Sequence, residues 1–181
     1  MSGTPEFSCS ETLRNGLTVT IRSLRADDRG RVAAAVGELN RESVYTRLFS
    51  YRKELTEAGL NRIMAVDPER EVALLVTRGV GPTEIAIASG RYIASDPRDT
   101  GATAEVAFVV EEDYQRLGIA GRLLKHLANI AREHGITAFE ADVLAENASM
   151  LAVFARSGLL MQQRREGNVI HVTMSLRPAT A

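Results

Sequence analysis

The chain has 181 residues, of which 45% are hydrophobic and 25% charged, and its formal net charge is −1. These values are typical of one soluble globular domain, and the charge balance argues against nucleic acid or an acidic membrane as a partner. The single cysteine, Cys9, cannot form an internal disulfide, and the first residues lack a signal-peptide pattern, so we expect a cytoplasmic protein. Three scattered histidines indicate no metal site.

We expect residues 1–12 to form a flexible tail and residues 13–181 a single domain. Residues 17–24 alternate apolar and polar side chains and predict a first strand. Helical spacing and cap residues then predict helices over residues 26–39, 41–49 and 56–66. Two strands over 71–77 and 84–94 flank a Gly/Pro turn and predict an antiparallel hairpin.

The stretch from Thr103 to His134 organises the rest of the chain. Residues 104–110 are branched or aromatic except for Glu105 and predict a central strand, after which a Gly-containing turn leads into an amphipathic helix ended by Gly135. A strand over 137–144 follows, so a parallel crossover should place it beside the central strand. A helix capped by Asn147 or Ser149 and two strands over 160–165 and 168–176 complete a mixed α/β fold.

The turn between the central strand and its helix is a candidate anion site, because free backbone N–H groups and a positive helix end meet there. An ordinary loop with packing glycines is the alternative from composition alone. The P-loop pattern does not occur in this turn, and a Rossmann fingerprint would need its glycines directly after the strand.

The turn instead fits the pattern Q/R-x-x-G-x-G/A, met by residues 115–120. With Asn147 and the helix end Phe154-Ala155-Arg156-Ser157-Gly158-Leu159, it resembles the GNAT N-acetyltransferase superfamily over roughly residues 17–176. The resemblance implies an α/β fold with a central mixed sheet of six to seven strands, helices on both faces, and a splayed pair of parallel central strands.

The resemblance also implies acetyl-CoA as co-substrate, with no metal. The turn would hold the pyrophosphate through Gln115, Arg116, Leu117, Gly118, Ile119, Ala120 and Gly121. The backbone of Phe108, Val109 and Val110 would pair with the pantetheine arm, and the Val109 N–H would polarise the thioester carbonyl. Asn147 would approach the coenzyme near its pantetheine or thiol end, and Arg156 is a candidate for a coenzyme phosphate.

Glu105 is the candidate general base, because many GNAT enzymes resemble this chain in having a Glu at the start of the same strand. An end-of-strand Glu that reaches water or pairs with Arg is the alternative. Strand alternation places Glu105 with Ala107 and Val109, in partly apolar surroundings that would favour proton abstraction near neutral pH. Phe154 stands where the family often has a Tyr that acts as general acid, and because Phe has no proton to donate we expect it in the core. If an acid is needed, Tyr114, Ser149 or water would protonate the thiolate.

Residues 42–49 resemble a segment in the acetyltransferase domain of bacterial protein lysine acetyltransferases. Ser43, Tyr45 and Arg47 are therefore candidate acceptor contacts, although the segment also fits an amphipathic helix. The favoured acceptor is a protein lysine, such as one on an acyl-CoA synthetase. A small-molecule amine and an acyl-CoA sensor without turnover are the alternatives. Either a monomer or a homodimer is compatible with the sequence.

Overall fold

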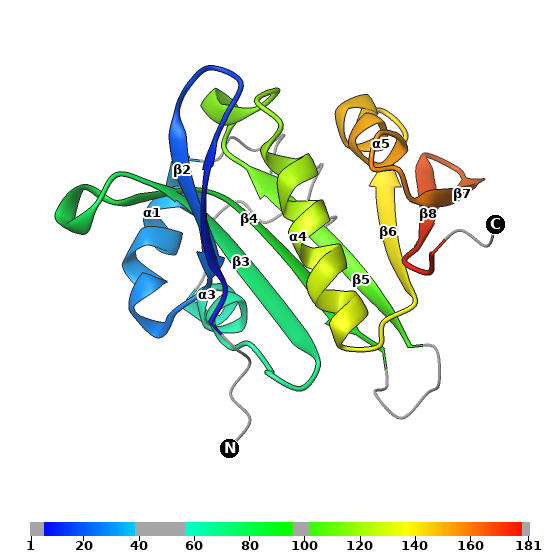
Figure 1. Cartoon of the computed structure of the whole chain (residues 1–181), viewed down its shortest axis with the longest axis horizontal. Coiled ribbons are helices and arrows are strands. Elements are labelled where there is room, and N and C mark those ends of the chain that lie inside the picture. The colour runs from blue at the N-terminus through cyan, green and yellow to red at the C-terminus, as the bar shows by residue number, and fades with distance from the viewer. Residues whose placement is uncertain (1–5, 39–56, 96–101, 179–181) are drawn as a thin grey trace.

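A computed structural model of the chain describes residues 6–38, 57–95 and 102–178. Its centre is one mixed sheet with the order β1-β2-β3-β4-β5-β6-β8-β7 (Figure 1). Among the described strands only the β5–β6 pair is parallel, which confirms the predicted α/β class, but the sheet of described residues has eight strands instead of six to seven. The strands are β1 Ser8–Thr12, β2 Thr18–Ser23, β3 Glu71–Arg78, β4 Ile85–Ala94, β5 Thr103–Val110, β6 Ala138–Leu144, β7 Leu160–Glu166 and β8 Val169–Ser175.

The additional strand comes from the predicted flexible tail, and that prediction is wrong for Ser8–Thr12. These residues form β1 and pair antiparallel with β2 in continuous register, from Ser8 opposite Arg22 to Thr12 opposite Thr18. The segment reads SCSET, which is short and polar, so its own β propensity is weak. The edge of β2 supplies the hydrogen-bonding partner that the local sequence cannot reveal.

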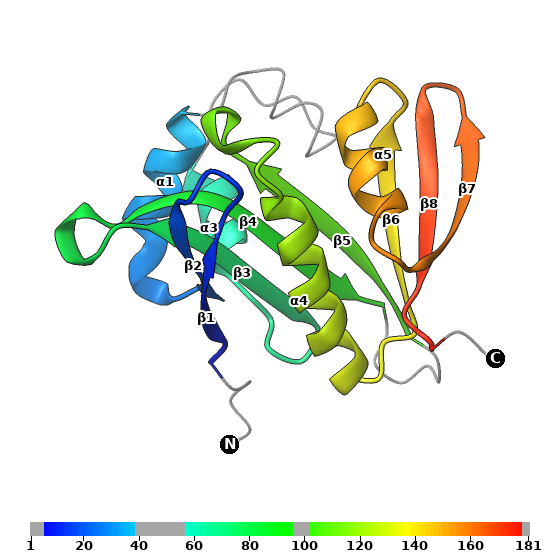
Figure 2. The same cartoon turned by 45° about the horizontal axis from the view of Figure 1, so that its top comes forward.

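Helices cover both faces of the sheet and create two apolar cores (Figures 1 and 2). On one face lie α4 (Ile119–Glu133) and α5 (Ala148–Ala155), whose buried side chains join the larger core. On the other face, α1 (Arg29–Glu38) and α3 (Glu57–Met64) pack around a smaller cluster of Val32, Leu60, Leu75 and Ala86. The helix predicted over residues 41–49 lies outside the described residues. Among those described, no helix is long and apolar enough to cross a bilayer.

The parallel strands β5 and β6 separate after three residue pairs. Thr103, Ala104 and Glu105 pair with residues 138–140, whereas β6 continues to pair with β8 along its whole length. Figure 2 shows the two strands meeting at this end and moving apart toward α5. The predicted splay is therefore present, and beyond Glu105 the edge of β5 that faces β6 has no strand partner in the described chain.

A buried ion pair fixes the entry to α1 against the sheet. Asp28 lies in a short 3₁₀ turn (Ala26–Asp28) and is fully buried; its two carboxylate oxygens accept hydrogen bonds of 2.8 and 2.7 Å from the Arg22 guanidinium. Asp28 also accepts the Arg25 N–H at 2.7 Å. Burial alone would raise the pKa of Asp28, but the hydrogen bonds and the charge of Arg22 outweigh it and lower that pKa.

Replacing Asp28 with Asn is expected to destabilise the protein by about 3 kcal/mol, because the buried Arg22 guanidinium would lose its bidentate carboxylate partner and keep only the Glu84 carboxylate, at 3.0 Å, as a counter-charge. A lowered pKa in the folded state stabilises the fold above the ordinary pKa of Asp, and this contribution is lost as the pH falls through the folded value. The difference in the free energy of unfolding between wild type and D28N should therefore become smaller at acidic pH, as measured by denaturant unfolding across pH. The neighbouring exposed Asp27 gives the control D27N, which should show neither effect.

Candidate active site

The turn between β5 and α4 is shaped by two residues in the left-handed region. Gly118, with φ of 87°, is the N-cap of α4, and Arg116 has φ of 65°. Arg116 is the only non-glycine residue of the described chain with positive φ, a conformation that persists where the surrounding structure determines it. The turn is thus held in a defined shape, as an anion-binding loop requires.

The N-terminal end of α4 is open to an anion. Gly118 offers no side chain to cap the helix, and the first turn contains no acidic residue. The N–H groups of Ile119, Ala120 and Gly121 have no acceptor within the helix by its geometry. Together with the helix dipole they present positive charge at one point.

A cavity of about 620 Å³ lies at this point, between the turn and α5. It brings together predicted coenzyme contacts from distant parts of the chain: Val110, Gln115, Arg116, Gly118, Ile119, Ala120, Gly121 and Arg156. Tyr114 and Ser149, the two candidate proton donors, line the same cavity. The cavity is therefore large enough, and lined by the right groups, to hold an extended phosphate-containing ligand.

Two cations in the cavity wall were missed by sequence reasoning. Arg14 comes from the connection between β1 and β2, and Arg122 from the second turn of α4. The Arg122 side chain donates to the Thr12 carbonyl at 3.1 Å and pairs with Glu11 at 2.6 Å, which joins β1 to the turn. Arg122 could have been identified from the sequence, because it lies one helical turn after Gly118 and therefore close to the anion-binding turn. Arg14 could not, because only the tertiary fold brings it to the cavity.

Leu117, Phe108, Val109 and Asn147 do not line this cavity. The Asn147 side chain is only 8% exposed and caps α5 by accepting the Met150 N–H at 3.2 Å. This confirms the predicted role of Asn147 as a helix cap. Its contact with the coenzyme stays a prediction. Phe154 is 1% exposed, and its ring lies 6.2 Å from that of Phe108, so its place in the core is confirmed.

The backbone groups of β5 alternate between β4 and the gap beside β6. At one end of the β4–β5 ladder the Glu111 N–H donates to the Ile87 carbonyl, and at the other end the Ser95 N–H donates to the Thr103 carbonyl. The pairing register between these two bonds is unbroken. Odd-numbered residues of β5 therefore bond to β4. The expected role of the Val109 N–H in polarising the thioester is wrong for this reason, since that N–H faces β4. The N–H and C=O groups of Val106, Phe108 and Val110 face the gap.

Glu105 occupies the last paired position before β5 and β6 separate, opposite Glu140. Its side chain is exposed and lies on the sheet face that also carries Ala107 and Val109. This face is the one covered by α1 and α3, opposite α4. The partly apolar surroundings expected for Glu105 are not found, because solvent reaches its carboxylate.

A second cavity of about 200 Å³ lies on the same face as Glu105. Its wall is mostly apolar and includes Ala107 and Val109 of β5, with Arg91 and Glu111 as charged members. Burial lowers the pKa of Arg91, whose guanidinium donates to the Ile63 carbonyl at 2.7 Å. The two cavities thus approach β5 from opposite faces of the sheet.

The acceptor candidates Ser43, Tyr45 and Arg47 lie outside the described residues.

Comparison with known proteins gives a consistent result. Residues 85–159 match the Acetyltransferase (GNAT) family. The crystal structure of the GNAT domain of PAT from S. lividans superposes with a TM-score of 0.80 at 31% identity, covering 93% of this chain and 96% of that domain. The match therefore extends over nearly the whole of both chains.

Two curated relatives carry the same kind of name. An acetyltransferase of Pseudomonas aeruginosa is 29% identical over 165 residues, covering 89% of this chain and 86% of the relative. Acetyltransferase Pat of Mycolicibacterium smegmatis is 31% identical over 159 residues, covering 87% of this chain. The chain spans 46% of the length of that mycobacterial relative, so less than half of it is represented here.

Proposed function

The chain belongs to the GNAT acetyltransferase family and is an acetyl-CoA-dependent N-acetyltransferase, and we propose that its acceptor is the side-chain amine of a protein lysine. The observation that supports acetyl transfer by this chain is the opening between β5 and β6, with the anion-binding turn at its wide end and Glu105 at its narrow end. This arrangement separates the place that holds the donor from the place where a proton is removed.

On the donor side, the pyrophosphate of acetyl-CoA would lie against the N–H groups of residues 116–121, with Arg14 and Arg156 at the cavity wall as candidates for its phosphates. The pantetheine amides would then bond to the backbone of Val106, Phe108 and Val110, as an added strand bonds to a sheet edge. An N–H of this set, in place of that of Val109, would polarise the thioester carbonyl.

The chemical step is attack of the acceptor nitrogen on the thioester carbon. A C–N bond forms, the C–S bond breaks, and coenzyme A leaves as a thiolate that takes up one proton. The attacking ammonium must first lose a proton, and Glu105 accepts this proton directly or through a water. The nitrogen loses a second proton as the amide forms, and this proton balances the one that the thiolate takes up. The cavity on the Glu105 face and the opening between the strands hold amine and thioester together, so the reaction needs no covalent enzyme intermediate. Tyr114 and Ser149 line the cavity at the pyrophosphate end, so water beside the thiol is the candidate donor to the thiolate.

A protein acceptor is favoured by the 42–49 segment, which resembles that of bacterial protein lysine acetyltransferases. A small-molecule amine is the second candidate, favoured by the modest 200 Å³ size and mostly apolar wall of the cavity beside Ala107 and Val109. We propose that the protein acts in the cytoplasm.

The test is incubation of the protein and isotope-labelled acetyl-CoA with a lysate depleted of its own coenzyme, followed by mass spectrometry of proteins and metabolites. Label on lysine Nζ of a few proteins is the expected result. Label found only on free amines would assign the small-molecule alternative. Tight coenzyme binding without any labelled product would assign an acyl-CoA sensor.

A further inference from the structure

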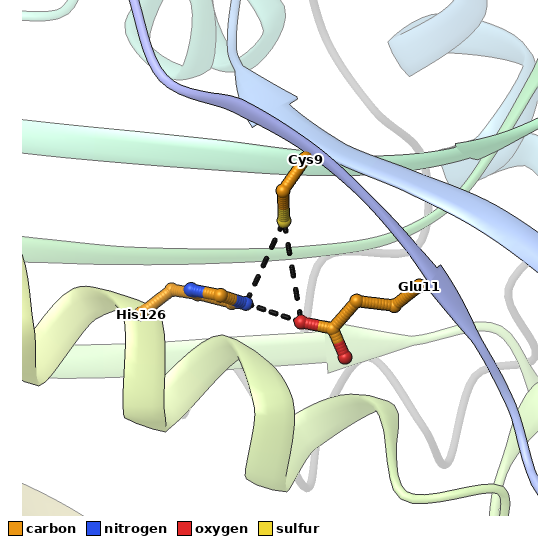
Figure 3. A group of neighbouring side chains, drawn as sticks. All are labelled: Cys9, Glu11 and His126. Carbon is orange, nitrogen blue, oxygen red and sulfur yellow. Dashed lines mark hydrogen bonds and ion pairs between the residues drawn. The ribbon is translucent and has the colours of Figure 1, made fainter.

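Three side chains with metal-binding atoms meet beside the anion-binding turn although they are distant in sequence. Cys9 and Glu11 project from the same face of β1, and His126 projects from the facing side of α4 (Figure 3). Their ligand atoms, the Cys9 Sγ, a Glu11 carboxylate oxygen and the His126 Nε2, all lie within 4.8 Å of one another. No other such group of three occurs in the described part of the chain.

The spacing of these atoms suits a small tetrahedral cation. Around Zn²⁺, sulfur at about 2.3 Å and nitrogen or oxygen at about 2.0–2.1 Å are separated by roughly 3.3–3.6 Å from one another. The Cys9 Sγ lies 3.7 Å from the His126 Nε2 and 4.0 Å from the Glu11 Oε1. The Glu11 Oε1 and the His126 Nε2 are hydrogen-bonded, so a metal would have to replace that contact by separating the two atoms slightly.

The surroundings orient the three ligands. The second oxygen of Glu11 is held by the Arg122 guanidinium at 2.6 Å, which leaves the first oxygen directed at Cys9 and His126. The Phe7 ring packs on the His126 imidazole with 5.0 Å between centroids. All three ligands are partly buried, so one side of the site reaches solvent. Neighbours that fix ligating side chains in this way are typical of metal sites.

We propose that Cys9, Glu11 and His126 bind a thiophilic divalent cation of the Zn²⁺ type, with water in the fourth position. A thiolate, an imidazole and a carboxylate form a ligand set that Zn²⁺ accepts, and the metal displaces the thiol proton when it binds. The bound ion joins β1 to α4. Because Glu11 also pairs with Arg122, the ion fixes the strand that holds Arg122 at the wall of the coenzyme cavity.

The test uses the full chain with Co²⁺ as a spectroscopic probe and Zn²⁺ as a competitor. We expect one equivalent of Co²⁺ to produce a thiolate-to-cobalt charge-transfer band that Zn²⁺ removes. Zn²⁺ at about 100 times its Kd should raise Tm by roughly 5–10 °C. C9S should abolish the band, and H126Q should weaken Co²⁺ binding by more than about 100-fold, since loss of even an outer partner costs 10–100-fold.

The matched control is H171Q. The His171 imidazole also has two carboxylate neighbours, Asp142 and Glu166, but no cysteine, so this variant should leave the band unchanged. A second measurement needs no variant: Zn²⁺ should slow modification of Cys9 by a thiol reagent at least about 10-fold, and a chelator should restore it. The proposal would be overturned if neither the band nor the protection appeared with metal in large excess over the protein. The three side chains would then only link β1 to α4 by hydrogen bonds.

Discussion

Replacing Glu105 with Gln is expected to lower kcat/KM for acetyl transfer by about 10²–10⁴-fold, the usual contribution of a positioned general base. The amide keeps the shape of the side chain but cannot accept the proton of the attacking amine. Glu105 is exposed and does not line the coenzyme cavity, so the Kd for acetyl-CoA should change by less than about twofold. Thiol release in the presence of an acceptor lysine peptide measures the first quantity, and calorimetric titration measures the second.

The control for this variant is E140Q. Glu140 lies opposite Glu105 in the parallel pair and is also exposed, so it is the same residue type at the same level of the sheet. We expect E140Q to keep at least about half of the wild-type activity. If E140Q lost turnover and E105Q retained it, the base would be assigned to β6 instead of β5.

Replacing Gly118 with Ala is expected to raise the Kd for acetyl-CoA about 10-fold or more. Its backbone φ of 87° strains any residue with a Cβ, by about 1–2 kcal/mol. The added Cβ would also lie 2.7 Å from the Arg122 Nη1, so the end of that side chain would have to shift. The backbone strain distorts the turn that should hold the pyrophosphate. Equilibrium titration with acetyl-CoA and with coenzyme A measures the change.

G135A is the matched control for G118A. Gly135 follows the other end of α4 with a similar φ of 78°, and a Cβ there would contact nothing within 4 Å. The two variants should therefore carry a similar conformational cost in thermal unfolding, but only G118A should weaken coenzyme binding. Equal Kd values for the two variants would contradict the placement of the pyrophosphate at this turn.

Much of the fold was predictable because periodicity is a local property. The alternation in residues 17–24 and 137–144 predicted strands within one residue of those found, and the apolar stripe of α4 predicted its buried face. The strand β1 was missed because Ser8–Thr12 has no strand pattern of its own and depends on pairing with β2.

The site was predictable where it depends on backbone chemistry and not where it depends on tertiary contact. The turn around Gly118 was found from its glycines and its place between strand and helix. Arg14 reaches the cavity only because the β1–β2 hairpin lies over α4. The direction of the Val109 N–H depends on the pairing register with β4, which alternation of side chains does not reveal. The three histidines are scattered in the sequence and indicated no metal site, and only the fold brings the His126 Nε2 to 3.7 Å from the Cys9 Sγ.

The most direct test of the account is a crystal structure of the protein with coenzyme A. We expect the pyrophosphate on the N–H groups of residues 116–121 and the pantetheine arm along Val106, Phe108 and Val110, with the thiol pointing toward Glu105 between β5 and β6. Coenzyme bound elsewhere, or a pantetheine arm that leaves the opening between these strands empty, would contradict the account.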